Sequence, residues 1–159
     1  DELPRELDLI RAVEDQIPEK VRSFYTRERP IEFRPVDPVD PFDPSTKPPA
    51  SHVWLRARGT LPDDRLTHQS MLAYATDYGL LSTALRPHGL SFVQPDLQLP
   101  TLAHAPWFHR PVQVDEWLLY ATDSPSASGA RGFTRGQLFA ADGTLVASVA
   151  QEGLMRVWE

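Results

Sequence analysis

The chain has 159 residues, which suits one domain with a hydrophobic core of its own. Its 16 basic and 22 acidic residues give a formal net charge of −6 without any long basic run, so we expect no nucleic-acid partner. The absence of cysteine excludes disulfides, thiolate zinc sites and a cysteine nucleophile. No apolar run approaches the roughly 20 residues that cross a bilayer, and no signal peptide is visible, so we expect no membrane partner and a cytoplasmic location.

Residues 1–29 are predicted to be a polar lead-in to a domain at residues 30–159. Apolar residues recur in it at spacings of three and four, as in a short amphipathic helix, which Pro18 is expected to end or bend. These residues are Leu7, Ile10, Val13 and Ile17. Residues 30–36 then alternate like a strand, and Pro35 confines that strand to a sheet edge or to its own end.

Residues 35–50 contain six of the 16 prolines, and we interpret them as a rigid surface loop. A strand is predicted at 52–61, followed by a helix from 64 to 85 with acidic residues at its start. Pro87 and Gly89 stop that helix. Because its apolar residues leave almost no polar face, we expect a sheet to wrap it.

The rest of the chain supplies such a sheet. Further strands are predicted near 97–109, 114–124, 131–140 and 144–157, and Asp142-Gly143 between the last two is a strong hairpin signal. The layout predicts an α+β domain in which an antiparallel sheet wraps a long buried helix, as in the hotdog fold. Spacing alone leaves an ordinary α+β sandwich open.

Two polar residues stand in apolar surroundings. Asp77 has only apolar or aromatic neighbours at helical spacing, so burial would make it costly and would strengthen it as a base. The alternative is that the helix ends near Tyr78 or turns Asp77 outward. Gln151 shares its parity in the last strand with apolar residues and glycine, and a buried amide needs partners. The alternative is a core glutamine that the backbone satisfies.

The other polar residues give weaker signals. Thr101 lies in a strand, where threonine is common, so by itself it is more typical of structure than of catalysis. His104 and His109 fall on opposite faces by parity, and the five histidines show no metal-binding spacing. We interpret each of them as structural or exposed. Neither a Gly-x-Ser-x-Gly elbow nor a glycine-rich phosphate loop occurs.

Several sequence blocks together resemble one family. The chain is similar, over about residues 30–157, to the C-terminal half of acyl-CoA thioesterase II of the TesB type. The blocks follow the family's order and comprise Leu61–Asp64, His68–Gln69, Leu72–Asp77, Arg86–Gly89, Trp107–Pro111, Glu116–Tyr120, Ser126–Gly132 and Gln151–Gly153. By this resemblance the protein is half of a double hotdog, in which two hotdog units share one chain.

The resemblance also implies a site and a reaction. Asp77 at the end of Leu-Ala-Tyr-Ala-Thr-Asp, Thr101 before Trp-Phe-His-Arg-Pro, and Gln151 match the family's catalytic Asp, Thr and Gln. They would position a water that cleaves a fatty acyl-CoA to free fatty acid and CoA, with no cofactor. The chain departs from the family where Ala103 replaces a common acidic residue and Ala105-Pro106 replaces a Ser-Met-like pair.

The chain begins with Asp1 rather than Met, and the family's N-terminal hotdog is missing, so we expect a fragment, a processed form or a trimmed chain. A single hotdog leaves a sheet edge that invites pairing, so we expect a homo-oligomer or a second hotdog unit as partner, with acyl-CoA as substrate. A non-catalytic hotdog module for acyl binding or assembly is the alternative function. A hotdog dehydratase fits poorly, because no histidine obviously pairs with Asp77.

Overall fold

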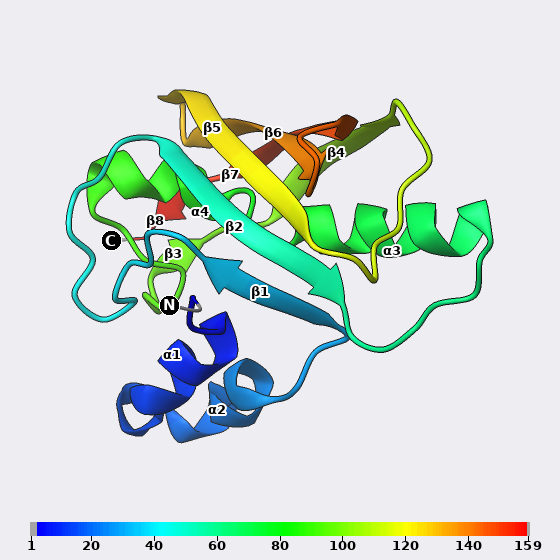
Figure 1. Cartoon of the computed structure of the whole chain (residues 1–159). Helices are drawn as coiled ribbons and strands as arrows, with labels where there is room; N and C mark the ends of the chain where they lie inside the picture. The colour runs from blue at the N-terminus through cyan, green and yellow to red at the C-terminus, as the bar shows by residue number, and fades with distance from the viewer. Residues whose placement is uncertain (1–2, 159) are drawn as a thin grey trace.

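A six-stranded antiparallel sheet forms the main layer of the computed structural model, which describes residues 3–158. The strand order is β1-β2-β5-β6-β7-β4, and helix α3 lies against one face (Figure 1). The strands are β1 (Ile31–Pro35), β2 (Ala50–Ala57), β4 (Thr101–Phe108), β5 (Leu118–Ser128), β6 (Arg131–Ala140) and β7 (Leu145–Leu154). A second sheet pairs β3 (Leu97–Gln98) with β8 (Arg156–Val157). The predicted layout is therefore confirmed.

The strand signals were right in kind and approximate at their ends. The predicted strand at 52–61 starts at Ala50 and stops at Ala57, and the predicted strand at 97–109 is divided between β3 and β4. β1 is an edge strand that ends at Pro35, as the proline required. Asp142 and Gly143 join β6 to β7 in a hairpin, where Gly143 adopts a φ of 86°.

The predicted helix is present, but it is divided into two helices by a short non-helical segment. Helix α3 (Arg65–Asp77) begins after Asp64, whose carboxylate accepts a hydrogen bond from the Thr67 N–H at 2.9 Å. The helical geometry stops at Asp77, and α4 (Ser82–Leu85) and the short 3₁₀ helix η2 (Arg86–His88) follow. Gly79, with a φ of 76°, lies in this interruption. The continuous helix from 64 to 85 was therefore wrong between Tyr78 and Leu81.

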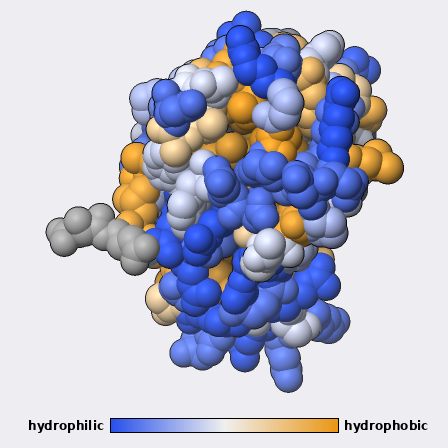
Figure 2. Space-filling model, turned by 45° about the vertical axis from the view of Figure 1, so that its right-hand side comes forward, coloured by the Kyte–Doolittle hydropathy of each residue, from blue (hydrophilic) through white to orange (hydrophobic). Residues whose placement is uncertain are grey.

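Only one side of α3 faces the sheet. Its buried residues are His68, Leu72, Ala75 and Thr76. On other sides Leu66 is 74% exposed and Tyr74 is 53% exposed, which corrects the expectation that the sheet covers almost the whole helix. Figure 2, which brings the right-hand side of Figure 1 forward, shows hydrophobic residues gathered near the top and surrounded by hydrophilic ones.

The core lies between the sheet and the helical region. Leu55, Leu72, Leu118 and Leu138 are among its fully buried side chains. Small residues on the inner face of the sheet let the helices approach closely, and Gly132 and Gly153 lie under Leu81 of the interrupted segment. The interruption therefore brings Leu80 and Leu81 into the core rather than exposing them.

The lead-in segment forms two helices instead of one. They are α1 (Glu6–Ala12) and α2 (Glu19–Thr26), with the 3₁₀ helix η1 (Glu14–Gln16) between them. Pro18 precedes α2 and starts it, so it does not end the first helix as expected. The predicted boundary between lead-in and domain at residue 30 stays a prediction.

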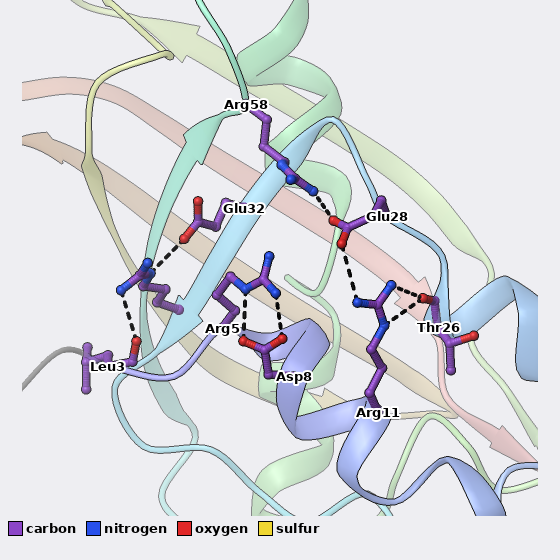
Figure 3. Close-up of polar contacts among 9 residues, drawn as sticks. Leu3, Arg5, Asp8, Arg11, Thr26, Glu28, Glu32 and Arg58 are labelled. Atoms are coloured by element: carbon purple, nitrogen blue, oxygen red, sulfur yellow. Dashed lines mark hydrogen bonds and ion pairs between the residues drawn. The ribbon is translucent and has the colours of Figure 1, made fainter.

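Polar contacts tie the lead-in to the sheet (Figure 3). Glu28 accepts hydrogen bonds from Arg11 at 3.4 Å and from Arg58, which follows β2. Arg34 of β1 donates to the Leu3 carbonyl at 3.2 Å. Ile10 and Ile17 are buried as well. The lead-in is therefore packed beside the β1 edge, as Figure 1 shows. Within residues 3–158, no helix has the length and apolar character needed to span a membrane.

We expect Gly136→Ala to lower the free energy of unfolding by about 1–3 kcal/mol, although alanine suits a strand better than glycine. An added Cβ would collide with the Tyr120 ring and would lie 2.9 Å from Val149 Cγ1. Urea unfolding followed by circular dichroism measures the change. Gln137→Ala, at the neighbouring exposed position, is the control and should stay within about 0.5 kcal/mol. Equal stability of Gly136→Ala and the wild type would contradict the close packing.

Candidate active site

The structure brings Asp77, Thr101 and Gln151 together, from three different elements. Asp77 is the last residue of α3, Thr101 is the first residue of the edge strand β4, and Gln151 lies in β7. The Gln151 Nε2 donates to Asp77 Oδ1 at 2.6 Å and to Thr101 Oγ1 at 2.7 Å. The Thr101 hydroxyl donates to the same Asp77 oxygen at 3.3 Å. Residues 24 to 74 positions apart in sequence thus form one closed hydrogen-bond ring.

The chemistry of the three groups fixes the direction of these bonds. An amide nitrogen carries two hydrogens, and Gln151 uses both. A hydroxyl carries one hydrogen, so Thr101 accepts from Gln151 and donates to Asp77. Asp77 only accepts, which is the pattern of an ionised carboxylate. Its second oxygen, Oδ2, receives no hydrogen bond from any described residue, so it is available to accept a proton.

Asp77 is not buried as the sequence suggested. It is an exposed residue at the C-terminal end of α3, and the alternative in which the helix ends there is correct. The expected desolvation is therefore absent in this chain. A helix C-terminus carries partial negative charge, which is unfavourable for a carboxylate. The donors of Gln151 and Thr101 offset that effect and hold the carboxylate in one orientation.

Gln151 is buried as predicted, with 1% of its surface exposed. Val149, Gln151 and Gly153 alternate toward the helix, so the parity of the strand was the right signal. The amide oxygen, Oε1, is buried and has no hydrogen-bond partner in the described chain. Exchanging the amide oxygen and nitrogen would set an oxygen 2.6 Å from Asp77 Oδ1, which is repulsive. The observed orientation therefore favours the carboxylate at the cost of an unpaired oxygen.

A bulge in β4 explains why parity failed in this strand. The register shifts between Thr101, which pairs with Gly153, and Ala103, which pairs with Glu152. An extra residue in a strand reverses the face of everything beyond it. His104 therefore lies opposite Gln151 and, like Thr101, reaches the helix side, where its Nε2 is 3.3 Å from Thr76 Oγ1. The contact agrees with the interpretation of His104 as a structural residue, but its place on the helix side follows from the bulge and was not predicted.

Tyr120 in β5 binds the C-terminal end of α3. Its hydroxyl donates to the Thr76 carbonyl at 3.0 Å, which satisfies one of the free carbonyls at the helix end. Burial raises the pKa of Tyr120 well above 10.0, and the negative charge of Asp77 raises it further. Tyr120 therefore remains a hydrogen-bond donor.

An open cavity lies beside this site and not at it. It has a volume of about 170 Å³ and lies between the proline loop, α1 and α4. Apolar residues line much of it, including Phe33, Val53, Leu85 and Phe92. Tyr78 and Gly79, which directly follow Asp77, belong to its wall, whereas Asp77, Thr101 and Gln151 do not.

Comparison with known proteins places this fold in a class. A conserved protein with a hot dog fold from Alicyclobacillus acidocaldarius superposes with a TM-score of 0.58 at 16% identity, covering 82% of this chain and 47% of that one. The protein is thus a hotdog protein, as predicted. The family model for acyl-CoA thioesterase matches residues 21–154. The chain belongs to the acyl-CoA thioesterase family.

Two relatives show how much of the family's length is present. Acyl-CoA thioesterase 2 of Haemophilus influenzae is 36% identical over 151 residues, which cover 95% of this chain and 53% of that protein. The crystal structure of acyl-CoA thioesterase II TesB2 from Mycobacterium marinum superposes with a TM-score of 0.69 at 36% identity, covering 92% of this chain and 54% of that one. The chain therefore spans about half the length of these relatives.

We expect the free energy of unfolding to fall above pH 10 more steeply in the wild type than in Tyr120→Phe, by about 1.4 kcal/mol per pH unit. The unfolded tyrosine loses its proton near 10.0, whereas the buried one keeps it. This contribution to stability is complete below pH 10 and is lost as the pH rises toward the raised pKa. Urea unfolding of both proteins at pH 9, 10 and 11 measures it. Parallel pH dependences would contradict a buried, protonated Tyr120.

Proposed function

We propose that this protein hydrolyses fatty acyl-CoA thioesters to free fatty acid and CoA, by direct attack of water. The observation that carries the proposal is the hydrogen-bond ring in which Gln151 and Thr101 hold the Asp77 carboxylate. The relatives named acyl-CoA thioesterase support the substrate class. This proposal is favoured over a non-catalytic acyl-binding module, because a module that only binds has no need of an oriented carboxylate with a free oxygen.

Asp77 acts as the general base in this mechanism. Its free Oδ2 takes a proton from the attacking water, while Oδ1 stays bound to Gln151 and Thr101. Both donors of Gln151 and the one hydrogen of Thr101 are used within the ring, so these residues orient the carboxylate. The remaining lone pair of Thr101 Oγ1 is available to accept from the water. The water oxygen bonds to the thioester carbonyl carbon and gives a tetrahedral intermediate. Its collapse breaks the carbon–sulfur bond, CoA leaves as its thiolate, and Asp77 returns its proton to that sulfur or to solvent. No cofactor enters the reaction.

The apolar cavity beside the site suits the acyl chain. Tyr78 and Gly79 form part of its wall and directly follow Asp77, so the thioester would lie at Asp77 with its chain directed toward the cavity. The polar residues of the cavity include Asp37 and Arg86, which bind each other at 2.8 Å.

A second hotdog unit is proposed to pair along β4. This strand is a sheet edge of eight residues, and it carries Thr101 of the candidate site. The opposite edge, β1, is five residues long, ends in Pro35 and has the lead-in helices beside it (Figure 1). The β4 side also presents Leu102 and Trp107, both about half exposed. The partner is a copy of this chain or another hotdog unit, and the expected compartment is the cytoplasm.

We expect Asp77→Asn to lower kcat for acyl-CoA hydrolysis by about 10²–10⁴-fold, because the amide keeps the shape of the carboxylate but cannot act as a base. The measurement is release of free CoA thiol from acyl-CoAs of several chain lengths by the complete protein. Asp43→Asn makes the same chemical change at an exposed position of the proline loop and should retain wild-type kcat. If Asp77→Asn keeps most of the wild-type rate, the assignment of the base is wrong.

Leu102→Lys is expected to weaken self-association, or association with the second unit, at least tenfold, because it sets a charge on the exposed β4 edge. Sedimentation velocity across a concentration series measures the dissociation constant. Val36→Lys, at a similarly exposed apolar residue beyond β1, should leave it unchanged. A wild type that stays monomeric at high micromolar concentration, with no second unit bound, would contradict pairing.

A further inference from the structure

We propose that His104 is a positioning residue of this site, which acts through Thr76 to keep Asp77 in place. Its kinetic test rests on the proposed hydrolysis, whereas its structural test does not. Asp77 is exposed, so packing holds its side chain only weakly. Its position depends on how firmly the last turn of α3 is attached to the sheet. Thr76, the residue before it, is 1% exposed and makes the polar contacts that attach this turn.

Three contacts converge on Thr76, and His104 supplies one of them. The Thr76 hydroxyl donates to the Ala73 carbonyl at 3.2 Å, within the last turn of the helix. The Thr76 carbonyl accepts from the Tyr120 hydroxyl at 3.0 Å, which fixes the turn to β5. The Thr76 hydroxyl is also 3.3 Å from His104 Nε2, which fixes the turn to β4. Donors from two strands thus hold the helix end between them.

The hydrogen count relates the donor in the third contact to the tautomer of His104. When the single Thr76 hydrogen is given to Ala73, the Thr76 oxygen accepts from His104, and Nε2 carries the hydrogen; in the other tautomer the Thr76 hydroxyl donates to Nε2. The bond donated by His104 exists in the neutral Nε2–H form of histidine and also in the imidazolium form. His104 therefore holds Thr76 in either protonation state, which distinguishes positioning from proton transfer.

The strand register places His104 next to the hydrogen-bond ring. His104 lies directly opposite Gln151, whose amide holds Asp77 and Thr101. The same edge strand therefore contacts the helix end twice, through Thr101 at Asp77 and through His104 at Thr76. Without the His104 contact, the 3.3 Å bond from Thr101 to Asp77 would be the one hydrogen bond left between β4 and α3 among the described residues.

The kinetic test uses four variants of the complete protein and one matched control variant. We expect His104→Ala to lower kcat about tenfold with KM changed less than twofold, because a displaced base slows the reaction without removing substrate contacts. His104→Gln restores an N–H donor near the same place and should recover most of the loss. Thr76→Val should match His104→Ala, and the double variant Thr76→Val/His104→Ala should be no slower than either. His109→Ala is the matched control, because the exposed His109 side chain hydrogen-bonds to Ser148 at 2.8 Å and not to the helix end, and should keep wild-type kcat.

Three kinetic results would overturn the proposal. The first is a wild-type kcat in His104→Ala. The second is a double variant whose loss of kcat equals the product of the two single losses. The third is the loss of one limb of the pH–kcat profile in His104→Gln. The last would show that His104 moves a proton.

The structural test needs no turnover. Nitrogen-15 NMR measures hydrogen exchange at the Gln151 side-chain amide, whose hydrogens are bound to Asp77 and Thr101. We expect exchange at least fivefold faster in His104→Ala and near the wild-type rate in His104→Gln. Unchanged exchange in His104→Ala would overturn the positioning role. If the wild type hydrolyses no acyl-CoA while the exchange result is as expected, the proposed function fails and the positioning inference stands.

Discussion

The hydrogen bond from Gln151 to Asp77 is the interaction on which the candidate site depends. It joins a buried amide in the middle of the sheet to an exposed carboxylate at the end of a helix. Burial fixes the position of the Gln151 amide, and the amide then fixes the orientation of the Asp77 carboxylate at the surface. This orientation leaves the Gln151 Oε1 without a hydrogen-bond partner among the described residues. A site that sacrifices a buried hydrogen bond to orient one acid is typical of a functional centre.

The helix must end where it does for this to work. Had α3 continued beyond Asp77, the Leu80 N–H would have bound the Thr76 carbonyl that the Tyr120 hydroxyl now satisfies. Gly79 allows the chain to turn away, and Leu80 and Leu81 re-enter the core against the glycines of β6 and β7. The close packing of those glycines therefore belongs to the same constraint as the site, because it fixes where the interrupted helix resumes.

The sequence foretold the sheet, the hairpin and two of the three site residues by pattern. Gln151 stood out because strand parity is strict where no bulge intervenes, and β7 has none from Ala147 to Gly153. Asp77 stood out for its neighbours, but the pattern left open whether it is buried or lies where the helix ends, and the structure shows the second. Thr101 came only from family resemblance. The contact of His104 with the helix was not predicted, because one residue inserted in β4 reverses the face on which His104 lies. No local signal in the sequence marks this bulge.

The exposure of Asp77 and the unpaired β4 edge both indicate that the site needs a further unit to exclude water. A carboxylate in bulk water interacts weakly with developing charge, because the dielectric constant is high, and a base works best where water is excluded and dipoles are preorganised. This chain supplies the oriented acid but leaves it at the rim of its sheet. Thr101, which holds Asp77, lies on the edge strand that has no neighbour on its outer side in the described chain. A unit paired along β4 would cover the strand that carries Thr101 and His104, so the proposed assembly would complete the proposed active site. The length comparison points the same way, because relatives about twice as long have room for a second unit of this size.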